Sequence, residues 1–179
     1  MSEHNSNFFA ILSRMKYINR WSLMRNSTRE SLSDHTLDVI FISHALAVIS
    51  NTYFGGNVDE GRVALLAAFH DAPEIITGDL PTPIKYFDKN IKTAYENVES
   101  SAKQRMIDSL PGELAPGYSS IMNADRDGDP ELIRFVKVAD KLSALIKCIE
   151  EEQSGNTDFR AAKESTIKRI SEMNMPELD

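Results

Sequence analysis

Cysteine is almost missing from this chain, since its 179 residues contain only one, Cys148. A single cysteine excludes a disulfide within the chain and favours a reducing compartment, so we expect a cytoplasmic protein. Cys148 lies in the apolar segment 145–149 of a predicted helix, where a free thiol packs as a small hydrophobic group. The sequence therefore predicts a core residue at this position rather than a catalytic nucleophile.

Long hydrophobic runs and an excess of basic residues are also absent. The first residues lack the basic region and the apolar stretch of a signal peptide. The most apolar segment, residues 37–49, contains Asp38 and His44 and is shorter than the ~20 residues of a membrane span. The net charge of −7 disfavours binding to a nucleic-acid backbone, whereas a small anion can still bind through a cation and an arginine. We expect neither a membrane nor a nucleic-acid polymer as a partner.

The alternation typical of β-strands is likewise missing, and apolar residues recur at helical spacing. Hydrophobic residues make up 41% and charged residues 26% of the chain, which suits one globular domain. The spacing predicts helices over residues 8–18, 33–49, 60–72, 84–110, 130–153 and 159–173, a rigid loop over 78–83 and irregular chain over 113–128. The second of these helices, with Ser33 as its N-cap, is apolar on most sides, which predicts a buried central helix. We predict an all-α, single-domain helical bundle.

Four side chains with metal-binding chemistry lie on or beside the predicted helices: His35, His70, Asp71 and Asp140. Imidazole and carboxylate together suit divalent metals such as Mn, Fe, Co, Ni or Zn. His35 opens one helix, the His70–Asp71 pair closes another, and Asp140 lies inside a third. Packing of the three helices can therefore bring the four groups to one point.

Asp140 is the most informative of the four. Its spacing from Val136 and Ala144 places it on the side of the helix that faces the core. A buried carboxylate without a partner is costly, and a metal ion is one of the few groups that makes it tolerable. An ion pair with Lys137 or Lys141 at the edge of the core is the alternative.

The ordered set of His35, the His70–Asp71 pair and Asp140 resembles the H…HD…D signature of the HD superfamily of metal-dependent phosphohydrolases. Further segments are similar to those of bacterial 5′-deoxynucleotidases, namely Asn19–Trp21, Met24–Asn26, His70–Ala72, Thr77–Pro83 and Lys147–Cys148. The resemblance covers about residues 7–170 and implies a single HD-type domain over residues 1–179. Asp34 stands where this family leads us to expect Glu, and Pro73 where we expect Ser.

This resemblance implies hydrolysis of deoxyribonucleoside 5′-monophosphates to deoxyribonucleoside and phosphate, by a homodimer. One divalent transition metal ion (Co, Mn, Zn, Ni, Fe or Cu) is implied on His35, His70, Asp71 and Asp140. The implied catalytic residues are Glu74, a general base for water, and Asp79, which contacts the sugar or protonates the leaving oxygen. The implied substrate-binding residues are Arg20, Trp21, His35, Asp71, Asp79, Leu80, Pro81, Thr82 and Asp140.

Trp21, the only tryptophan, directly follows the predicted phosphate-binding Arg20. An indole is large and rigid, so we predict that it fixes the substrate and leaves no room for a 2′-hydroxyl group. The alternative is that Trp21 anchors the hydrophobic core.

The remaining histidines favour one metal ion rather than two. His44 follows His35 by nine residues, which at ~100° per residue turns it to the opposite side of an ideal helix. We therefore expect a core histidine there, while His4 lies in a polar tail. This count disfavours an HD-type oxygenase, which needs a di-iron site.

Two further functions stay open at this point. One is another HD-type nucleotide phosphohydrolase, acting on a triphosphate or a cyclic nucleotide, which should need more basic residues than Arg20, Lys85 and Arg25. The other is a helical binding module without enzymatic activity, which leaves the His70–Asp71 pair and Asp140 unexplained.

Overall fold

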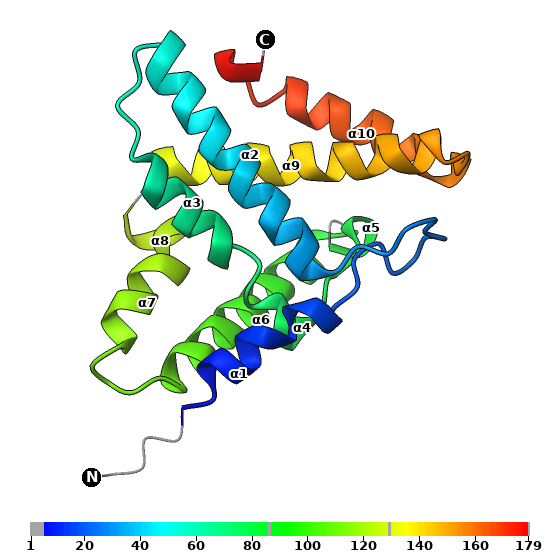
Figure 1. The fold of residues 1–179 in the computed structure, drawn as a ribbon. Coiled ribbons are helices and arrows are strands. Elements are labelled where there is room, and N and C mark those ends of the chain that lie inside the picture. Colours follow the sequence, from blue (N-terminus) through cyan, green and yellow to red (C-terminus); the bar gives the residue numbers. More distant parts are fainter. Residues whose placement is uncertain (1–5, 86, 129, 179) are drawn as a thin grey trace.

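Two long crossing helices organise the computed structural model, which describes residues 6–85, 87–128 and 130–178 (Figure 1). These are α2 (Leu32–Tyr53) and α9 (Pro130–Gln153), flanked by α3 (Glu60–Phe69) and α10 (Arg160–Ser171). The other elements are α1 (Phe8–Leu12), α4 (Glu74–Thr77), α5 (Thr82–Lys85), α6 (Lys89–Asp108), α7 (Ala115–Met122), α8 (Ala124–Asp127) and the 3-10 turns Ser13–Tyr17, Thr157–Phe159 and Pro176–Leu178. Over the described residues there is no β-strand, only an isolated bridge between Asn19 and Ser31. The predicted all-α fold is confirmed.

Helix α2 begins two residues before the predicted start, so the assignment of Ser33 as N-cap is wrong. The N-cap is Ser31, whose hydroxyl accepts a hydrogen bond from the Asp34 backbone N–H at 3.2 Å. The Asp34 carboxylate in turn accepts from the Ser31 N–H at 2.9 Å, which completes a capping box. This reciprocal cap holds the first turn that carries His35.

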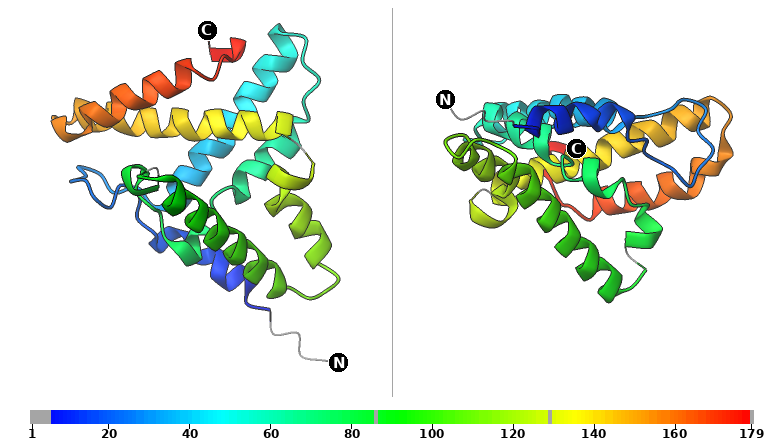
Figure 2. Two further views of the ribbon diagram at one scale, coloured as in Figure 1. Left: turned by 180° about the vertical axis from the view of Figure 1, so that it is seen from behind. Right: turned by 90° about the horizontal axis from the view of Figure 1, so that it is seen from below.

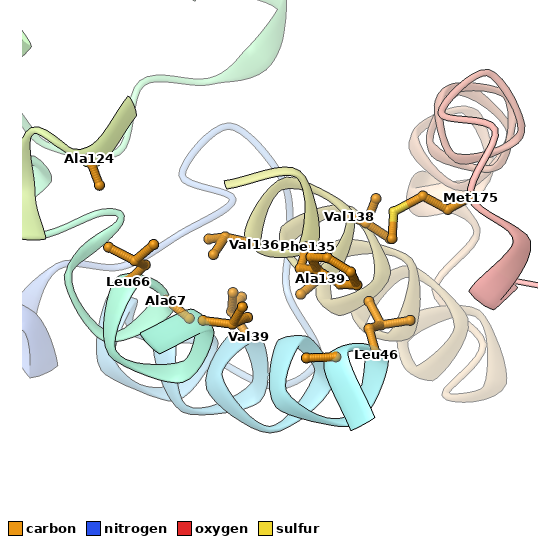
Figure 3. Packing of buried hydrophobic residues seen from close by; sticks show 12 residues of the cluster. Val39, Leu46, Leu66, Ala67, Ala124, Phe135, Val136, Val138, Ala139 and Met175 are labelled. Atoms are coloured by element: carbon orange, nitrogen blue, oxygen red, sulfur yellow. The ribbon is translucent and has the colours of Figure 1, made fainter. Parts of the chain in front are cut away.

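The main core forms where α2, α3 and α9 meet (Figure 3). Its fully buried members include Val39, Ala47, Val63, Ala67, Val138 and Ala139. Burial of apolar surface at about 25 cal/mol per Å² stabilises this crossing of the three helices. The crossing places the first turn of α2, the end of α3 and the middle of α9 close together.

Helix α2 is central, but the prediction that it is buried on most sides is wrong. Leu37, Phe41 and Val48 form an exposed apolar stripe, in which Phe41 is 64% exposed. His44 lies on the same exposed side, so it is not a core histidine, although it does point away from His35. In the described part of the chain, α2 alone has the length and hydropathy of a membrane span. The core helix of a globular protein meets the same criterion, and α2 packs on α3 and α9.

A second apolar cluster joins the N-terminal segment to α4, α6 and α7, in the lower half of Figure 1 and of the left panel of Figure 2. The predicted helix over residues 8–18 becomes the short α1 followed by a 3-10 turn. The predicted helix over 84–110 is divided, because the Asp88 carboxylate accepts from the Ile91 N–H at 2.8 Å and starts α6 anew. The region predicted to be irregular holds α7, whose first turn accommodates Pro116 without losing a backbone hydrogen bond.

Candidate metal and nucleotide site

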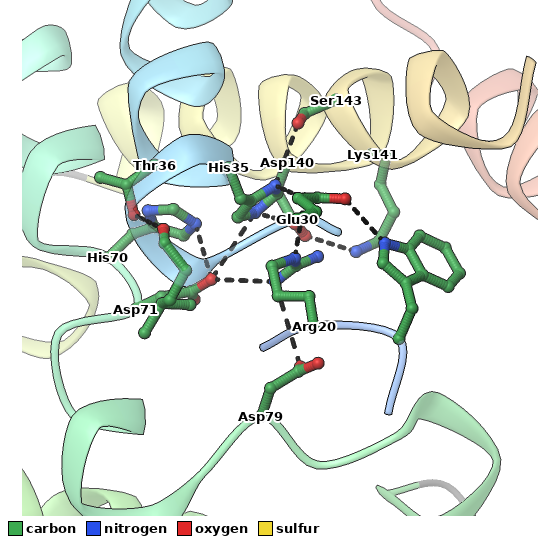
Figure 4. Close-up of polar contacts among 12 residues, drawn as sticks. Arg20, Glu30, His35, Thr36, His70, Asp71, Asp79, Asp140, Lys141 and Ser143 are labelled. Carbon is green, nitrogen blue, oxygen red and sulfur yellow. Dashed lines mark hydrogen bonds and ion pairs between the residues drawn. The ribbon is translucent and has the colours of Figure 1, made fainter. Parts of the chain in front are cut away.

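The core crossing brings the four predicted metal-binding residues together (Figure 4). His35 comes from α2, His70 and Asp71 directly follow α3, and Asp140 projects from the middle of α9. The His35 Nε2 atom lies 3.2 Å from Asp140 Oδ1 and 3.6 Å from Asp71 Oδ2. The His70 Nε2 atom lies 3.1 Å from the same Asp71 oxygen. One ligand atom each of His35, His70 and Asp71 lies within 4.8 Å of the others, and Asp140 adjoins this group through His35. Imidazole nitrogens and carboxylates together suit a divalent transition metal.

The orientation of the two imidazole rings fits a metal ion. The Nδ1 atom of His70 lies 2.7 Å from the Ala67 carbonyl oxygen, which can only accept, so Nδ1 carries the hydrogen. The Nδ1 atom of His35 lies 3.0 Å from the Ser143 hydroxyl. Both Nε2 atoms are buried without a hydrogen-bond partner and face the carboxylates. Hydrogen bonds to the second ring nitrogen fix the tautomer and the ring orientation of metal-binding histidines.

The carboxylates of this cluster are held in their charged form. Burial raises the pKa of Asp71, but the neighbouring His70 outweighs burial and lowers it to about 2. Burial likewise opposes ionisation of Asp140, yet contact with His35 and Lys141 brings its pKa well below the usual range. An ionised carboxylate is the form that binds a cation.

Asp140 shows both features that the sequence offered as alternatives, contact with the metal-binding cluster and an ion pair with a neighbouring lysine. Its Oδ1 atom faces His35, whereas Oδ2 receives a hydrogen bond from Lys141 Nζ at 2.5 Å. Its side chain is 26% exposed, so it lies at the border of the core rather than inside it. Lys137, the other proposed partner, is exposed on the adjoining turn.

A cavity of about 540 Å³ opens beside the cluster and is large enough for a nucleotide. Its wall contains the predicted substrate-binding residues Arg20, Trp21, Asp79, Leu80, Pro81, Thr82 and Asp140. His35 and Asp71, which were also predicted to bind substrate, lie behind this wall, and Asp71 lines a second cavity instead. Sequence reasoning missed the opposite wall, which α10 supplies through Ala161, Ala162, Ser165 and Arg169. No local pattern marks α10 as part of the site, because its contribution depends on its packing along α9.

The second cavity, of about 280 Å³, reaches the cluster from the other side and contains Glu74. It is lined by Ile133, Val136 and Lys137 of α9, whereas the larger cavity is lined by Lys141 and Ala144, so Asp140 separates the two. Lys85 also lines the second cavity, and Arg25 lines neither of the two.

Glu74, the predicted general base, is buried in this second cavity. Its Oε2 atom has no hydrogen-bond partner. Burial, with the nearby charges of Asp71 and Asp79, raises the pKa of Glu74 to about 9. A positive charge placed beside Asp71 would favour the ionised form of Glu74.

Arg20 lies at the centre of a set of carboxylates rather than in a surface ion pair. Its guanidinium group lies 3.1 Å from Glu30, 3.5 Å from Asp71 and 4.0 Å from Asp79. Burial raises the pKa of Asp79 and is only partly offset by Arg20, so Asp79 keeps its proton more readily than an exposed aspartate. Arg20 thus connects the cluster to the loop that carries Asp79.

Glu30 is a site residue that sequence reasoning missed. Its carboxylate accepts hydrogen bonds from Arg20 Nε at 3.1 Å and Trp21 Nε1 at 2.9 Å, and it lies 3.4 Å from His35 Nδ1. Burial raises the pKa of Glu30, but contact with His35 and Arg20 outweighs it and lowers the pKa. Glu30 follows Trp21 by nine positions and Arg20 by ten, through irregular chain, and no periodic pattern predicts a contact across such a segment.

The irregular segment that carries Arg20 and Glu30 is anchored to α9 by Glu151. This carboxylate accepts from the backbone N–H groups of Ser27 at 2.8 Å and Thr28 at 3.2 Å. It also accepts from Lys147 at 2.5 Å, and Lys147 donates in addition to the Thr28 carbonyl oxygen. Lys147, which was noted above only because of the family resemblance, thus helps to hold this segment against α9. The neighbouring Cys148 is buried, as predicted, and burial raises the pKa of its thiol to about 11.

Comparison with known proteins agrees with this site. The model of the family described as 5′-deoxynucleotidase YfbR-like matches residues 7–179. The chain is 47% identical to a 5′-deoxynucleotidase of Photorhabdus temperata, over 97% of this chain and 88% of that protein. It is 43% identical to a 5′-deoxynucleotidase of Erwinia tasmaniensis, over 98% of this chain and 88% of that protein.

Solved structures share the fold. An HD-domain phosphohydrolase from Listeria innocua superposes with a TM-score of 0.79 at 23% identity, covering 93% of this chain and 81% of that one. A cyanophage S-2L HD phosphohydrolase, described as bound to dA and one catalytic Zn²⁺ ion, gives a TM-score of 0.65 at 16% identity, with 90% and 80% covered. These structures show the shared fold alone, whereas the match over residues 7–179 and the 47% identity establish that the chain belongs to the YfbR-like 5′-deoxynucleotidase family.

Proposed function

We propose that this protein hydrolyses deoxyribonucleoside 5′-monophosphates to deoxyribonucleoside and phosphate. The observation that carries the proposal is the nucleotide-sized cavity, which is bordered by Arg20 and Asp79 and reaches the His–Asp cluster at Asp140. The curated relatives named 5′-deoxynucleotidase support the same reaction. Their identity of 43–47% over nearly the whole chain favours an enzyme over a binding module.

His35, His70, Asp71 and Asp140 would hold one divalent transition metal ion. Such an ion supplies a bound water of lowered pKa and a positive charge for the phosphate. Co, Mn, Zn, Ni, Fe and Cu all suit this donor set, and the Zn²⁺ ion named for the cyanophage protein supports zinc among them.

Three side chains of this protein carry the remaining chemistry. Arg20 binds the phosphate, since a guanidinium group matches phosphate oxygens in pairs. Glu74 accepts a proton from the attacking water, whose oxygen forms the new bond to phosphorus. As the bond between phosphorus and the 5′-oxygen breaks, Asp79 donates a proton to that leaving oxygen. The raised pKa of Asp79 suits a proton donor.

A monophosphate fits the cavity better than a more highly charged nucleotide. Of the residues expected to bind extra phosphates, only Arg20 lines the large cavity, since Lys85 lies in the other and Arg25 in neither. Lys141 and Arg169 also line the large cavity, but Lys141 is paired with Asp140.

We further propose that residues 1–179 form one domain and that two copies associate in the cytoplasm. The exposed apolar stripe of Leu37, Phe41 and Val48 on α2 supports a homodimer, because a contiguous exposed apolar patch commonly marks an interface. Light scattering should give the mass of a dimer for the native protein and of a monomer for Phe41→Glu. A monomeric native protein would contradict this proposal.

Phosphate release from a panel of ribo- and deoxyribonucleotides, each with several divalent metals, tests the activity. We expect release from deoxyribonucleoside 5′-monophosphates and little from triphosphates or cyclic nucleotides. Metal-loaded protein that releases phosphate from none of the deoxyribonucleotides would refute the proposed reaction.

The metal site has its own test, which does not depend on turnover. His70→Ala and Asp140→Ala should each lose bound metal, measured by elemental analysis, together with activity. His44→Ala, which removes an exposed histidine from α2, serves as the matched control and should retain both. Stoichiometric metal in the first two variants would disprove this ligand set.

A further inference from the structure

We infer that Glu30 is a positioning residue, whose single carboxylate holds Arg20, Trp21 and His35 in the arrangement that binds the nucleotide. This inference rests on the proposed function, since it assigns Arg20 and Trp21 to the substrate. The three partners lie five, nine and ten positions from Glu30 along the chain, and all their contacts converge on a side chain that is 10% exposed (Figure 4).

The two carboxylate oxygens of Glu30 have different partners. Oε1 accepts from Arg20 Nε at 3.1 Å and lies 3.4 Å from His35 Nδ1, whereas Oε2 accepts from Trp21 Nε1 at 2.9 Å. The contact through Nε leaves one outer nitrogen of the guanidinium group, Nη1, directed at Asp71 and Asp79, whose oxygens lie 3.5 and 4.0 Å away. Glu30 thus turns the outer edge of Arg20 toward the cluster and the cavity.

The backbone of Trp21 shows why the indole needs a fixed partner. Trp21 has a φ of 58°, in the left-handed region that a bulky side chain rarely adopts. Such a conformation persists only when the surrounding structure holds it. The indole packs on Phe159 with 5.2 Å between ring centroids, and its one hydrogen-bonding group, Nε1, donates to Glu30.

The backbone of Glu30 is itself held in register with the segment that it positions. The Arg20 N–H donates to the Glu30 carbonyl oxygen at 3.0 Å, and the Leu32 N–H donates to the Ile18 carbonyl oxygen at 2.8 Å. These bonds flank the bridge between Asn19 and Ser31. Glu30 therefore reaches Arg20 and Trp21 from a rigid short pairing that leads directly into the capped start of α2.

The test compares Glu30→Gln and Glu30→Ala with the native protein and with Glu60→Gln. Glutamine keeps the shape and one acceptor oxygen, whereas alanine removes both oxygens. Glu60 accepts from Asn51 at the far end of α2, so Glu60→Gln controls for the loss of a partly buried carboxylate outside the site. Because Trp21 is the only tryptophan, fluorescence excited at the long-wavelength edge, where the five tyrosines do not absorb, reports on this indole alone.

We expect Glu30→Gln to fold, to show greater quenching of Trp21 fluorescence by acrylamide, and to raise KM for dAMP by about 10–100-fold with a smaller change in kcat. Glu30→Ala should show the larger change in both readouts, and Glu60→Gln neither. A KM that stays native while kcat and melting temperature fall together would reveal a merely structural role and overturn the inference. Native quenching in Glu30→Gln would overturn it as well.

The quenching measurement needs neither substrate nor metal, so it separates this inference from the proposed reaction. If the native protein hydrolyses no deoxyribonucleoside 5′-monophosphate, the proposed function fails, and quenching still decides whether Glu30 fixes Trp21. Should Glu30→Ala and Glu30→Gln both fail to fold, Glu30→Asp supplies the variant, since it keeps the charge but withdraws it by one methylene group. Native KM and quenching in Glu30→Asp would then contradict the inference.

Discussion

Trp21 lines the large cavity beside Arg20, and its ring also packs on Phe159. This position is compatible with both roles considered for it, contact with the substrate and anchoring of the core. A rigid indole beside the phosphate-binding arginine can exclude the 2′-hydroxyl group of a ribonucleotide, whereas an adaptable apolar wall discriminates weakly. We expect Trp21→Ala to stay folded and to lose its preference for dAMP over AMP in kcat/KM. Kinetics on both nucleotides and a melting curve on the same sample measure this. If the ratio is unchanged while stability and both activities fall together, Trp21 is a core anchor.

Glu74 allows a variant that separates catalysis from stability. Because burial raises its pKa to about 9, the metal-free protein carries a neutral Glu74 at pH 7, and Glu74→Gln should change the melting temperature little. The same substitution, like Glu74→Ala, removes a proton acceptor and should lower turnover by roughly 10²–10⁴-fold with metal retained. Turnover is best expressed per bound metal ion. A variant with native turnover on that scale would exclude Glu74 as the base.

Residue chemistry and order allowed the meeting of the four cluster residues to be predicted, whereas the placement of Asp79 to Thr82 at the substrate was implied only by the family resemblance. Glu30 was not predictable in this way, since its function depends on contacts made only after the segment folds back. Asp140 shows a further limit of sequence reasoning. Helical periodicity placed it on the inner face but did not reveal that one oxygen faces His35 while the other binds Lys141.

At the scale of elements, the helices with strong hydrophobic periodicity could be predicted from the sequence, whereas several of their boundaries could not. Helix α9 begins at Pro130 as predicted, because proline suits the first turn of a helix. Side-chain caps decided the boundaries that were wrong, as Ser31 starts α2 early and Asp88 starts α6 late. Helix α7 escaped prediction because Pro116 and Gly117 suggest a loop, although proline is tolerated in a first turn.

The anchoring of the segment 19–30 to α9 leads to a prediction on stability. The Glu151 side chain is 1% exposed and accepts bonds from Lys147, Ser27 and Asn156. Glu151→Gln leaves Lys147 buried beside a neutral group, and loss of one member of a buried ion pair costs about 3–5 kcal/mol. Urea unfolding at pH 7 should show this loss, while Glu150→Gln, an exposed neighbour on the same helix, should unfold like the native protein. Native stability in Glu151→Gln would contradict the anchoring role.

The contribution of Glu151 to the free energy of unfolding should depend on pH. Burial raises the pKa of Glu151, but the hydrogen bonds from Lys147, Ser27 and Asn156 outweigh it, so the folded pKa lies below the unfolded value. A lowered folded pKa contributes stability that is fully present above the unfolded pKa, near ~4.3, and is lost as pH falls toward the folded pKa. The difference in unfolding free energy between the native protein and Glu151→Gln should therefore be constant above about pH 6 and shrink in acid. A difference that grows as pH falls would have the wrong sign for this account.

At the scale of the whole molecule, the cluster joins the three helices that also form the main core. The end of α3, the first turn of α2 and the middle of α9 meet at one point, so a metal ion bound there would stabilise the folded state over the unfolded one. Dialysis against a chelator should lower the melting temperature, and restoring the metal should reverse the change. An unchanged melting temperature would indicate that the protein holds no ion at this point.

The two cavities have a consequence for the order in which products depart. Asp140 lines both, and each reaches the surface, through Leu23 on the larger side and Lys137 on the smaller. An enzyme with a single opening must release a deeply bound product second, whereas two openings remove that obligation. Deoxyadenosine and inorganic phosphate should therefore leave in either order, and each should inhibit dAMP hydrolysis competitively. A noncompetitive pattern for one of the two would show that this product must leave before the other.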